Sequence, residues 1–166
     1  DAVGRSAGPD AVVAWAWKSG GTAVTNTAGS ITSTVSANTT SGFSIVTYTG
    51  TNSSGSGTVG HGLGVAPSMI IVKSRTSSGS TWNAWVVGHQ SLGWSDNSTL
   101  YLNTTQAKFD GYLTTPWNNT APTSSVFSVA NNAGAGINYS GENYVAYCFS
   151  EVAGFSKFGS YTGNGS

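Results

Sequence analysis

The chain is 166 residues long, with six Lys and Arg against six Asp and Glu, and its formal net charge is zero. Ordinary globular domains are about one quarter charged, whereas here 7% of the residues are charged and 38% are hydrophobic. The balance leaves no basic face for nucleic-acid binding, and no apolar run reaches the roughly 18 residues that a membrane-spanning helix needs.

The strand-like segments are short, alternate small with large side chains, and are bounded by Gly, Asn, Ser and Pro. Helical periodicity is almost absent. The pattern predicts strands at residues 11–18, 43–49, 57–61, 68–75, 81–88, 98–103, 124–130, 143–151 and 155–161. Their spacing predicts an all-β fold, an antiparallel β-sandwich or jelly roll whose two sheets share one core.

Residues 19–42 differ from the rest because they hold no aromatic and no charged side chain. We interpret them as an extended Ser/Thr/Gly-rich linker, with a short edge strand at 31–35 as the alternative. The predicted organisation is a connecting strand at 1–18, this linker, and a sandwich body at 43–166.

Two stretches near the ends of the chain repeat stretches of its body. Residues 12–18 (VVAWAWK) follow the same alternation of small and large side chains as residues 144–150 (YVAYCFS). Residues 43–55 (FSIVTYTGTNSSG) are matched by residues 155–166 (FSKFGSYTGNGS). Such repetition is typical of a unit taken from a tandem array, or of a subunit whose terminal strand imitates that of a neighbour.

Four stretches carry a resemblance to a known family: ITSTVSANTT (31–40), GFSIVTYTGTNSSGSGTVGHGLGVAPSMIIVKSR (42–75), WNNTAPTSSVFSV (117–129) and YVAYCFSEVAGFSKFGSYTGNGS (144–166). With them the chain resembles the repeat domain of phage tail-fibre-like virion structural proteins. The resemblance implies an extracellular or virion location and a structural or adhesive role, and it supplies no catalytic residues. The uncharged polar composition agrees with that expectation.

The opening strand suggests how copies of the chain join. It carries Val12, Val13, Trp15 and Trp17, so both of its faces need cover. Added to the sheet of a neighbour, it would bury both faces and satisfy the backbone groups of an open sheet edge. A head-to-tail contact of this kind propagates into a filament of identical subunits. The alternative is a covalent tandem array, in which residues 11–18 fold onto the preceding domain.

Candidate chemistry is sparse, and the chain is predicted to be non-enzymatic, without catalytic residues, metal or cofactor. His61 is interpreted as binding a loop carbonyl and locking the turn before Pro67, because no nucleophile elbow accompanies it near Ser68. The acidic residues are dispersed and show no metal-ligand spacing. Cys148 lies in an apolar alternating run and is expected to be a small buried side chain.

An alternative function is a lectin-like, receptor-binding module. Trp94 and Trp117 lie in turn-like surroundings and are the candidate sugar contacts, since flat aromatic rings stack on pyranose faces. The N-x-S/T pattern also predicts sites at which a glycan could be attached covalently to asparagine. The candidate acceptors are Asn38, Asn52, Asn97, Asn103, Asn118 and Asn138.

Overall fold

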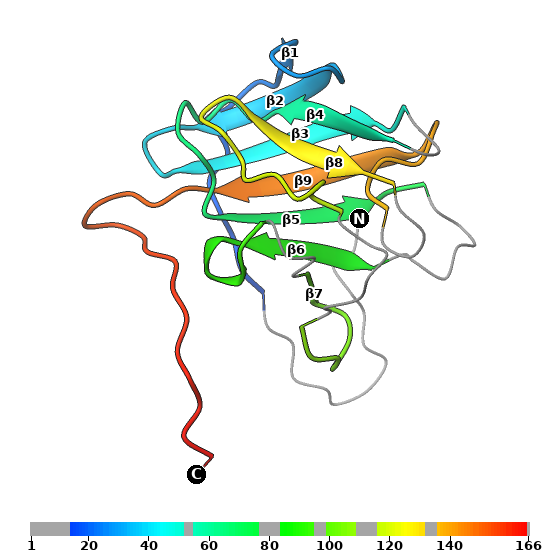
Figure 1. The fold of residues 1–166 in the computed structure, drawn as a ribbon. Coiled ribbons are helices and arrows are strands. Elements are labelled where there is room, and N and C mark those ends of the chain that lie inside the picture. The colour runs from blue at the N-terminus through cyan, green and yellow to red at the C-terminus, as the bar shows by residue number, and fades with distance from the viewer. Residues whose placement is uncertain are drawn as a thin grey trace, which may run out of the picture.

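The computed structural model describes residues 14–51, 55–76, 84–94, 99–108, 116–131 and 136–165. In these residues the fold is an all-β antiparallel sandwich, with one 3-10 turn at Gln90–Leu92 and no helix that could span a membrane. A seven-stranded sheet has the order β1-β2-β3-β9-β5-β6-β7, and β4 and β8 form a second sheet in front of it (Figure 1). The strands are β1 (Val24–Asn26), β2 (Ser33–Asn38), β3 (Phe43–Thr49), β4 (Ser56–Gly60), β5 (Met69–Ser74), β6 (Trp85–His89), β7 (Leu100–Tyr101), β8 (Val126–Ala130) and β9 (Asn143–Phe149).

The strands predicted between residues 43 and 151 are confirmed, most of them with shorter bounds. The two predicted strands at the ends are not formed in the residues that the structure describes. Of 11–18, the described residues 14–18 belong to no strand. Of 155–161, only Ser156 makes a single bridge, to Val152.

The linker prediction for residues 19–42 is wrong where β1 and β2 form. β2 pairs along its whole length with β3, from Ser33 opposite Tyr48 to Asn38 opposite Phe43. The Ser33 hydroxyl donates to the carbonyl oxygen of Gly60 at 2.9 Å, which ties β2 to β4. Ile31 and Val35 of the segment are also buried in the core, so the segment is part of the sandwich.

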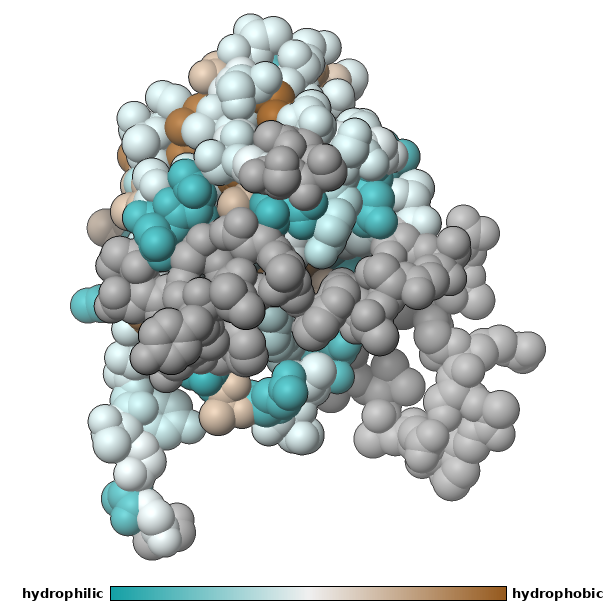
Figure 2. All heavy atoms as spheres, turned by 45° about the vertical axis from the view of Figure 1, so that its right-hand side comes forward, coloured by the Kyte–Doolittle hydropathy of each residue, from teal (hydrophilic) through white to brown (hydrophobic). Residues whose placement is uncertain are grey.

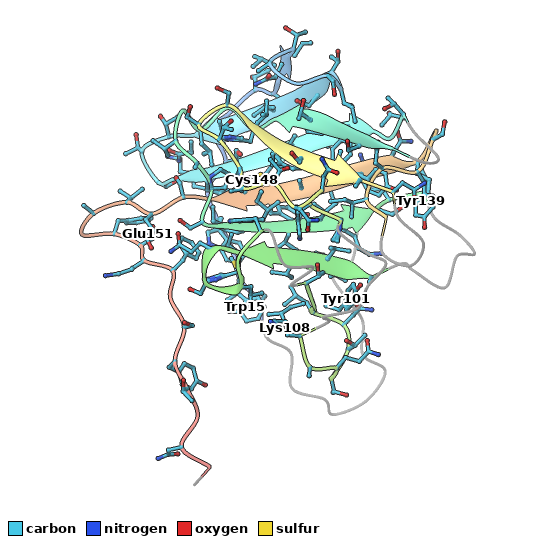
Figure 3. The ribbon with its side chains drawn as sticks, viewed as in Figure 1. Trp15, Tyr101, Lys108, Tyr139, Cys148 and Glu151 are labelled. Carbon is cyan, nitrogen blue, oxygen red and sulfur yellow. The ribbon has the colours of Figure 1, made fainter. Side chains whose placement is uncertain are left out.

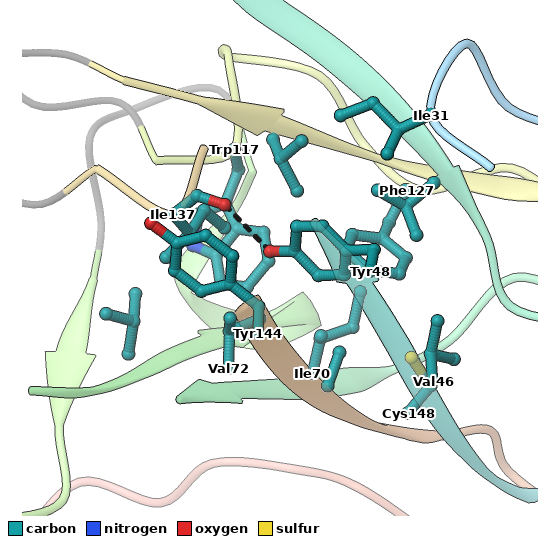
Figure 4. Packing of buried hydrophobic residues seen from close by; sticks show 14 of the residues in the cluster. Ile31, Val46, Tyr48, Ile70, Val72, Trp117, Phe127, Ile137, Tyr144 and Cys148 are labelled. Atoms are coloured by element: carbon teal, nitrogen blue, oxygen red, sulfur yellow. Dashed lines mark hydrogen bonds between the residues drawn. The ribbon is translucent and has the colours of Figure 1, made fainter. Parts of the chain in front are cut away.

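The core lies between the two sheets. Its largest part comes from alternate residues of the central strands: Val46 and Tyr48 of β3, Ile70 and Val72 of β5, and Tyr144, Ala146 and Cys148 of β9. Phe127 and Val129 of β8 close it from the other side. The Tyr48 hydroxyl donates to the carbonyl oxygen of Ile137 at 2.8 Å and so fastens the loop before β9 over the core (Figure 4).

Cys148 lies at the centre of the large sheet (Figure 3), as expected of a small buried side chain. Burial raises the pKa of its thiol to about 12. We therefore expect no reaction with Ellman's reagent at about pH 8 in the folded protein, because the thiolate is the reactive form. One thiol equivalent should react after unfolding in guanidinium chloride. Rapid labelling of the folded protein would contradict this placement of Cys148.

The surface of the described residues has the polar, weakly charged character that the composition predicts. Figure 2 shows mostly pale side chains near the middle of the hydropathy scale, with separate hydrophilic groups among them. The large exposed hydrophobic side chains include Trp15, Trp17, Phe155 and Tyr161, which lie in the segments before β1 and after β9.

Candidate assembly surface

The large sheet has a second face, directed away from the core, which we call the outer face. It is formed by the residues that alternate with the core residues of the four central strands. These are Phe43, Ile45 and Thr47 of β3, Val145, Tyr147 and Phe149 of β9, Met69, Ile71 and Lys73 of β5, and Trp85, Val87 and His89 of β6. Most are apolar, and Lys73 is the one Lys, Arg, Asp or Glu among them.

The segment before β1 crosses this outer face. Residues 14–20 pass behind the large sheet, on the side away from β4 and β8 (Figure 1). The indole of Trp17 stacks on the ring of Phe43 at 6.0 Å and meets the ring of Phe149 edge-on at 5.3 Å. Trp17 nevertheless remains 54% exposed and Trp15 76% exposed. The outer face therefore already binds an aromatic side chain of this segment.

The segment after β9 reaches the same aromatic group from the other side. The ring of Phe158 lies 6.1 Å from the ring of Phe149 and 6.3 Å from the ring of His89. The carboxylate of Glu151 accepts from the backbone N–H of Phe158 at 3.1 Å and from the Gln90 amide at 2.9 Å. Both hydrogen bonds lower the pKa of Glu151, and the bond from the Phe158 N–H has the larger effect. Both end segments thus meet at Phe149.

The sequence-predicted assembly residues lie partly in this region. Trp15 and Trp17 are placed as described, and neither is part of a strand. Val12 and Val13 lie outside the described residues. Pairing of this segment with a neighbouring copy stays a prediction.

The prediction of Trp117 as a ligand contact is wrong. Its side chain is 3% exposed and belongs to the hydrophobic core. The carbonyl oxygen of the preceding Pro116 accepts from the N–H of Ala130 at 2.8 Å, which pins the turn to the end of β8. Trp94 is half-buried and meets Trp117 at a ring distance of 5.4 Å, so its ligand contact stays a prediction.

The indoles of Trp94 and Trp117 pack against Gly88 of β6. A Cβ at Gly88 would lie 2.3 Å from Trp94 and 2.7 Å from Trp117, closer than van der Waals contact allows. We expect Gly88→Ala to lower the free energy of unfolding by about 1–3 kcal/mol, the usual cost of overpacking. Denaturant unfolding measures the change. Gly64→Ala, at a glycine with open space around it but a φ of +75°, reports the cost of backbone strain alone.

The candidate glycan acceptors have different environments. Asn138 is 0% exposed and its side-chain oxygen accepts from the N–H of Thr51 at 3.0 Å, so the prediction of a glycan there is wrong for the folded protein. Asn38 is half-buried and Asn103 and Asn118 are exposed. Asn52 and Asn97 lie outside the described residues. Glycosylation of the accessible residues stays a prediction.

His61 has the structural environment that the sequence predicts. It is 0% exposed, its Nε2 lies 3.2 Å from the carbonyl oxygen of Thr123, and its Nδ1 accepts from the N–H of Leu63 at 3.3 Å. Nε2 therefore carries the proton and donates to Thr123. Among the described residues, no group of three or more His, Cys, Asp and Glu side chains is arranged to hold a metal ion.

Comparison with known families gives one result. A family model described as a domain of unknown function (DUF7483) matches residues 4–166. No curated protein and no solved structure matches the chain.

Proposed function

The chain belongs to the DUF7483 family, whose function is unknown, and we propose that it is a structural subunit of an extracellular or virion fibre. Copies join head to tail, and the segment around residues 12–17 is the part of each subunit that engages its neighbour. The low charge and the stable antiparallel sandwich support a passive, load-carrying role.

The observation that carries the proposal is the exposure of two neighbouring tryptophans in a segment outside both sheets. Trp15 is 76% and Trp17 54% exposed. A tryptophan side chain is costly to leave in water, and tryptophans are enriched among the residues that dominate protein interfaces. Burial of an interfacial tryptophan contributes about 2 kcal/mol or more. A segment that carries two of them is suited to hold a lasting joint.

The outer face supplies the second half of the argument. It is broad and mostly apolar, and Trp17 of the same chain already packs on Phe43 and Phe149. Apolar surface that adjoins exposed aromatic side chains marks a site of association. Phe43 and Phe149 are buried in the single chain, so the surface left for a neighbour is the half-buried remainder of the outer face, including Ile45, Ile71 and Tyr147. With the exposed tryptophans, the subunit presents two apolar surfaces, as a head-to-tail contact requires.

Electron microscopy of the purified protein tests the proposal. Filaments are expected, and they should separate into single chains of 16.9 kDa on a denaturing gel, which distinguishes non-covalent assembly from a covalent array. A variant lacking residues 1–17 should stay monomeric, whereas one lacking residues 1–11 should still assemble because it keeps the aromatic segment. Isolated particles from the full chain, or filaments from the shorter variant, would overturn the proposal.

A further inference from the structure

Two segments that have the pattern of strands lie outside both sheets. Residues 14–18 form no strand, and residues 155–165 join no sheet, apart from the isolated bridge of Ser156 with Val152. Their large side chains are strongly exposed: Trp15 by 76%, Phe155 by 71% and Tyr161 by 94%. Each segment therefore has strand-forming residues whose partner strand is missing from its own sandwich.

Each segment resembles one of two strands that are partners of each other. Residues 12–17 follow β9 in their side-chain pattern, and residues 155–162 follow β3. In the sandwich β3 and β9 are hydrogen-bonded neighbours, antiparallel over their whole length from Phe43 opposite Phe149 to Thr49 opposite Asn143. Because residues 12–17 resemble β9 and residues 155–162 resemble β3, these two segments should pair as β9 and β3 do.

We propose that residues 14–17 of one copy pair antiparallel with residues 155–158 of a second copy, in the register of β3 and β9. The inference rests on the proposed function and names the acceptor of the joint. The register follows from the paired strands. It places Trp17 opposite Phe155, Ala16 opposite Ser156, Trp15 opposite Lys157, and Ala14 opposite Phe158.

The pairing needs a supporting surface, because a two-stranded ribbon alone is marginally stable in water. The outer face supplies it. Trp17 and Phe158, one from each segment, both contact Phe149 in the single chain. The end of the segment after β9 runs away from its own sandwich (Figure 1), and Tyr161 in it is 94% exposed.

Disulfide cross-linking tests the proposal, with two variants that each carry one introduced cysteine besides the buried Cys148. Ala16→Cys and Ser156→Cys protein, mixed and oxidised under assembly conditions, should give a covalent dimer on a non-reducing gel. Ala16→Cys mixed with Lys157→Cys is the matched control, since Lys157 is one residue out of register and its side chain points to the other side of the ribbon. Ser156 is half-buried and Lys157 exposed, so random collision would favour the control. We expect at least tenfold more dimer from the in-register pair.

The outcomes separate this inference from the proposed function. Filaments with equal cross-linking in both mixtures, or with none, overturn the pairing and leave the fibre proposal standing. A doubly substituted Ala16→Cys, Ser156→Cys chain that closes only on itself overturns the choice of a second copy. If Ser156→Cys lowers the melting temperature, both mixtures are oxidised well below the melting transition of that variant, so that the comparison remains valid with Trp15 and Trp17 in place.

Discussion

Trp15→Ser is expected to raise the critical concentration for filament formation by about 30-fold and to leave the melting temperature unchanged. The side chain is 76% exposed in the single subunit, so its removal costs the fold little. In the filament it would be buried, and loss of an interfacial tryptophan costs about 2 kcal/mol or more, where each 1.4 kcal/mol is a tenfold change. Sedimentation over a concentration series measures the critical concentration.

Val65→Ser is the matched control for this prediction. Val65 is another exposed large hydrophobic side chain, at 51%, and it lies in the turn between β4 and β5. It belongs neither to residues 12–17 nor to the outer face, so its effect on the critical concentration should be smaller than that of Trp15→Ser. Equal effects would show that assembly depends on general surface hydrophobicity. Unchanged assembly of Trp15→Ser would contradict the role of residues 12–17.

The second large effect is expected at His61. Replacement by Ala should lower the free energy of unfolding by about 2–4 kcal/mol. The carbonyl oxygen of Thr123 and the N–H of Leu63 would lose their partner, at about 1–3 kcal/mol for each buried group left unsatisfied. His61→Gln should cost less, because its amide can still donate toward Thr123. Urea unfolding of the three proteins at about pH 8 tests this order.

His61 also makes stability dependent on pH. Burial lowers its pKa below the usual 6.5, and the bond to the Thr123 carbonyl opposes the shift only in part. Above about pH 6.5 the imidazole is neutral in both states and contributes no pH dependence. Below it the unfolded chain takes up a proton that the folded chain does not, so stability falls as pH falls, until the folded pKa is reached. The slope is up to about 1.4 kcal/mol per pH unit.

The contribution of His61 is obtained from the difference between wild type and His61→Gln. His89 is half-buried and its pKa is lowered by burial as well, so it acts in the same direction and remains in both proteins. Imidazole NMR signals give an independent measurement on the folded wild type. The His61 signal should titrate below that of a free histidine. A normal titration, or equal slopes in both proteins, would contradict the prediction.

The body strands could be predicted because their own residues alternate, as in Phe43–Thr49 and Asn143–Phe149. β2 was harder, since Ser33–Asn38 offers Val35 as its one large apolar side chain. Its place depends on a bond from Ser33 to Gly60, 27 residues away, which no local pattern encodes. Residues 11–18 and 155–161 alternate small and large side chains as a strand does. A strand also needs a hydrogen-bonded neighbour, and the side-chain pattern does not show whether the chain provides one.

The candidate site was predicted in part. The exposed tryptophans could be named from the sequence, whereas the aromatic group around Phe149 depends on the register of four strands and could not. Trp117 was expected in solvent because of the turn residues around it. Its burial requires the contact with Gly88, and a glycine inside an apolar strand was the available signal, since it marks a close approach.

The position of β9 decides when the sandwich can close during synthesis. β9 lies between β3 and β5, so it joins β1, β2 and β3 to β5, β6 and β7. Its residues pair with residues of β3 that lie 94 positions earlier, at Thr49 opposite Asn143, to 106 positions earlier, at Phe43 opposite Phe149. Each half can pair locally as it leaves the ribosome, but the two halves remain separate until residue 149 has emerged. Closure is therefore late and non-local, which predicts slow folding for a domain of this size.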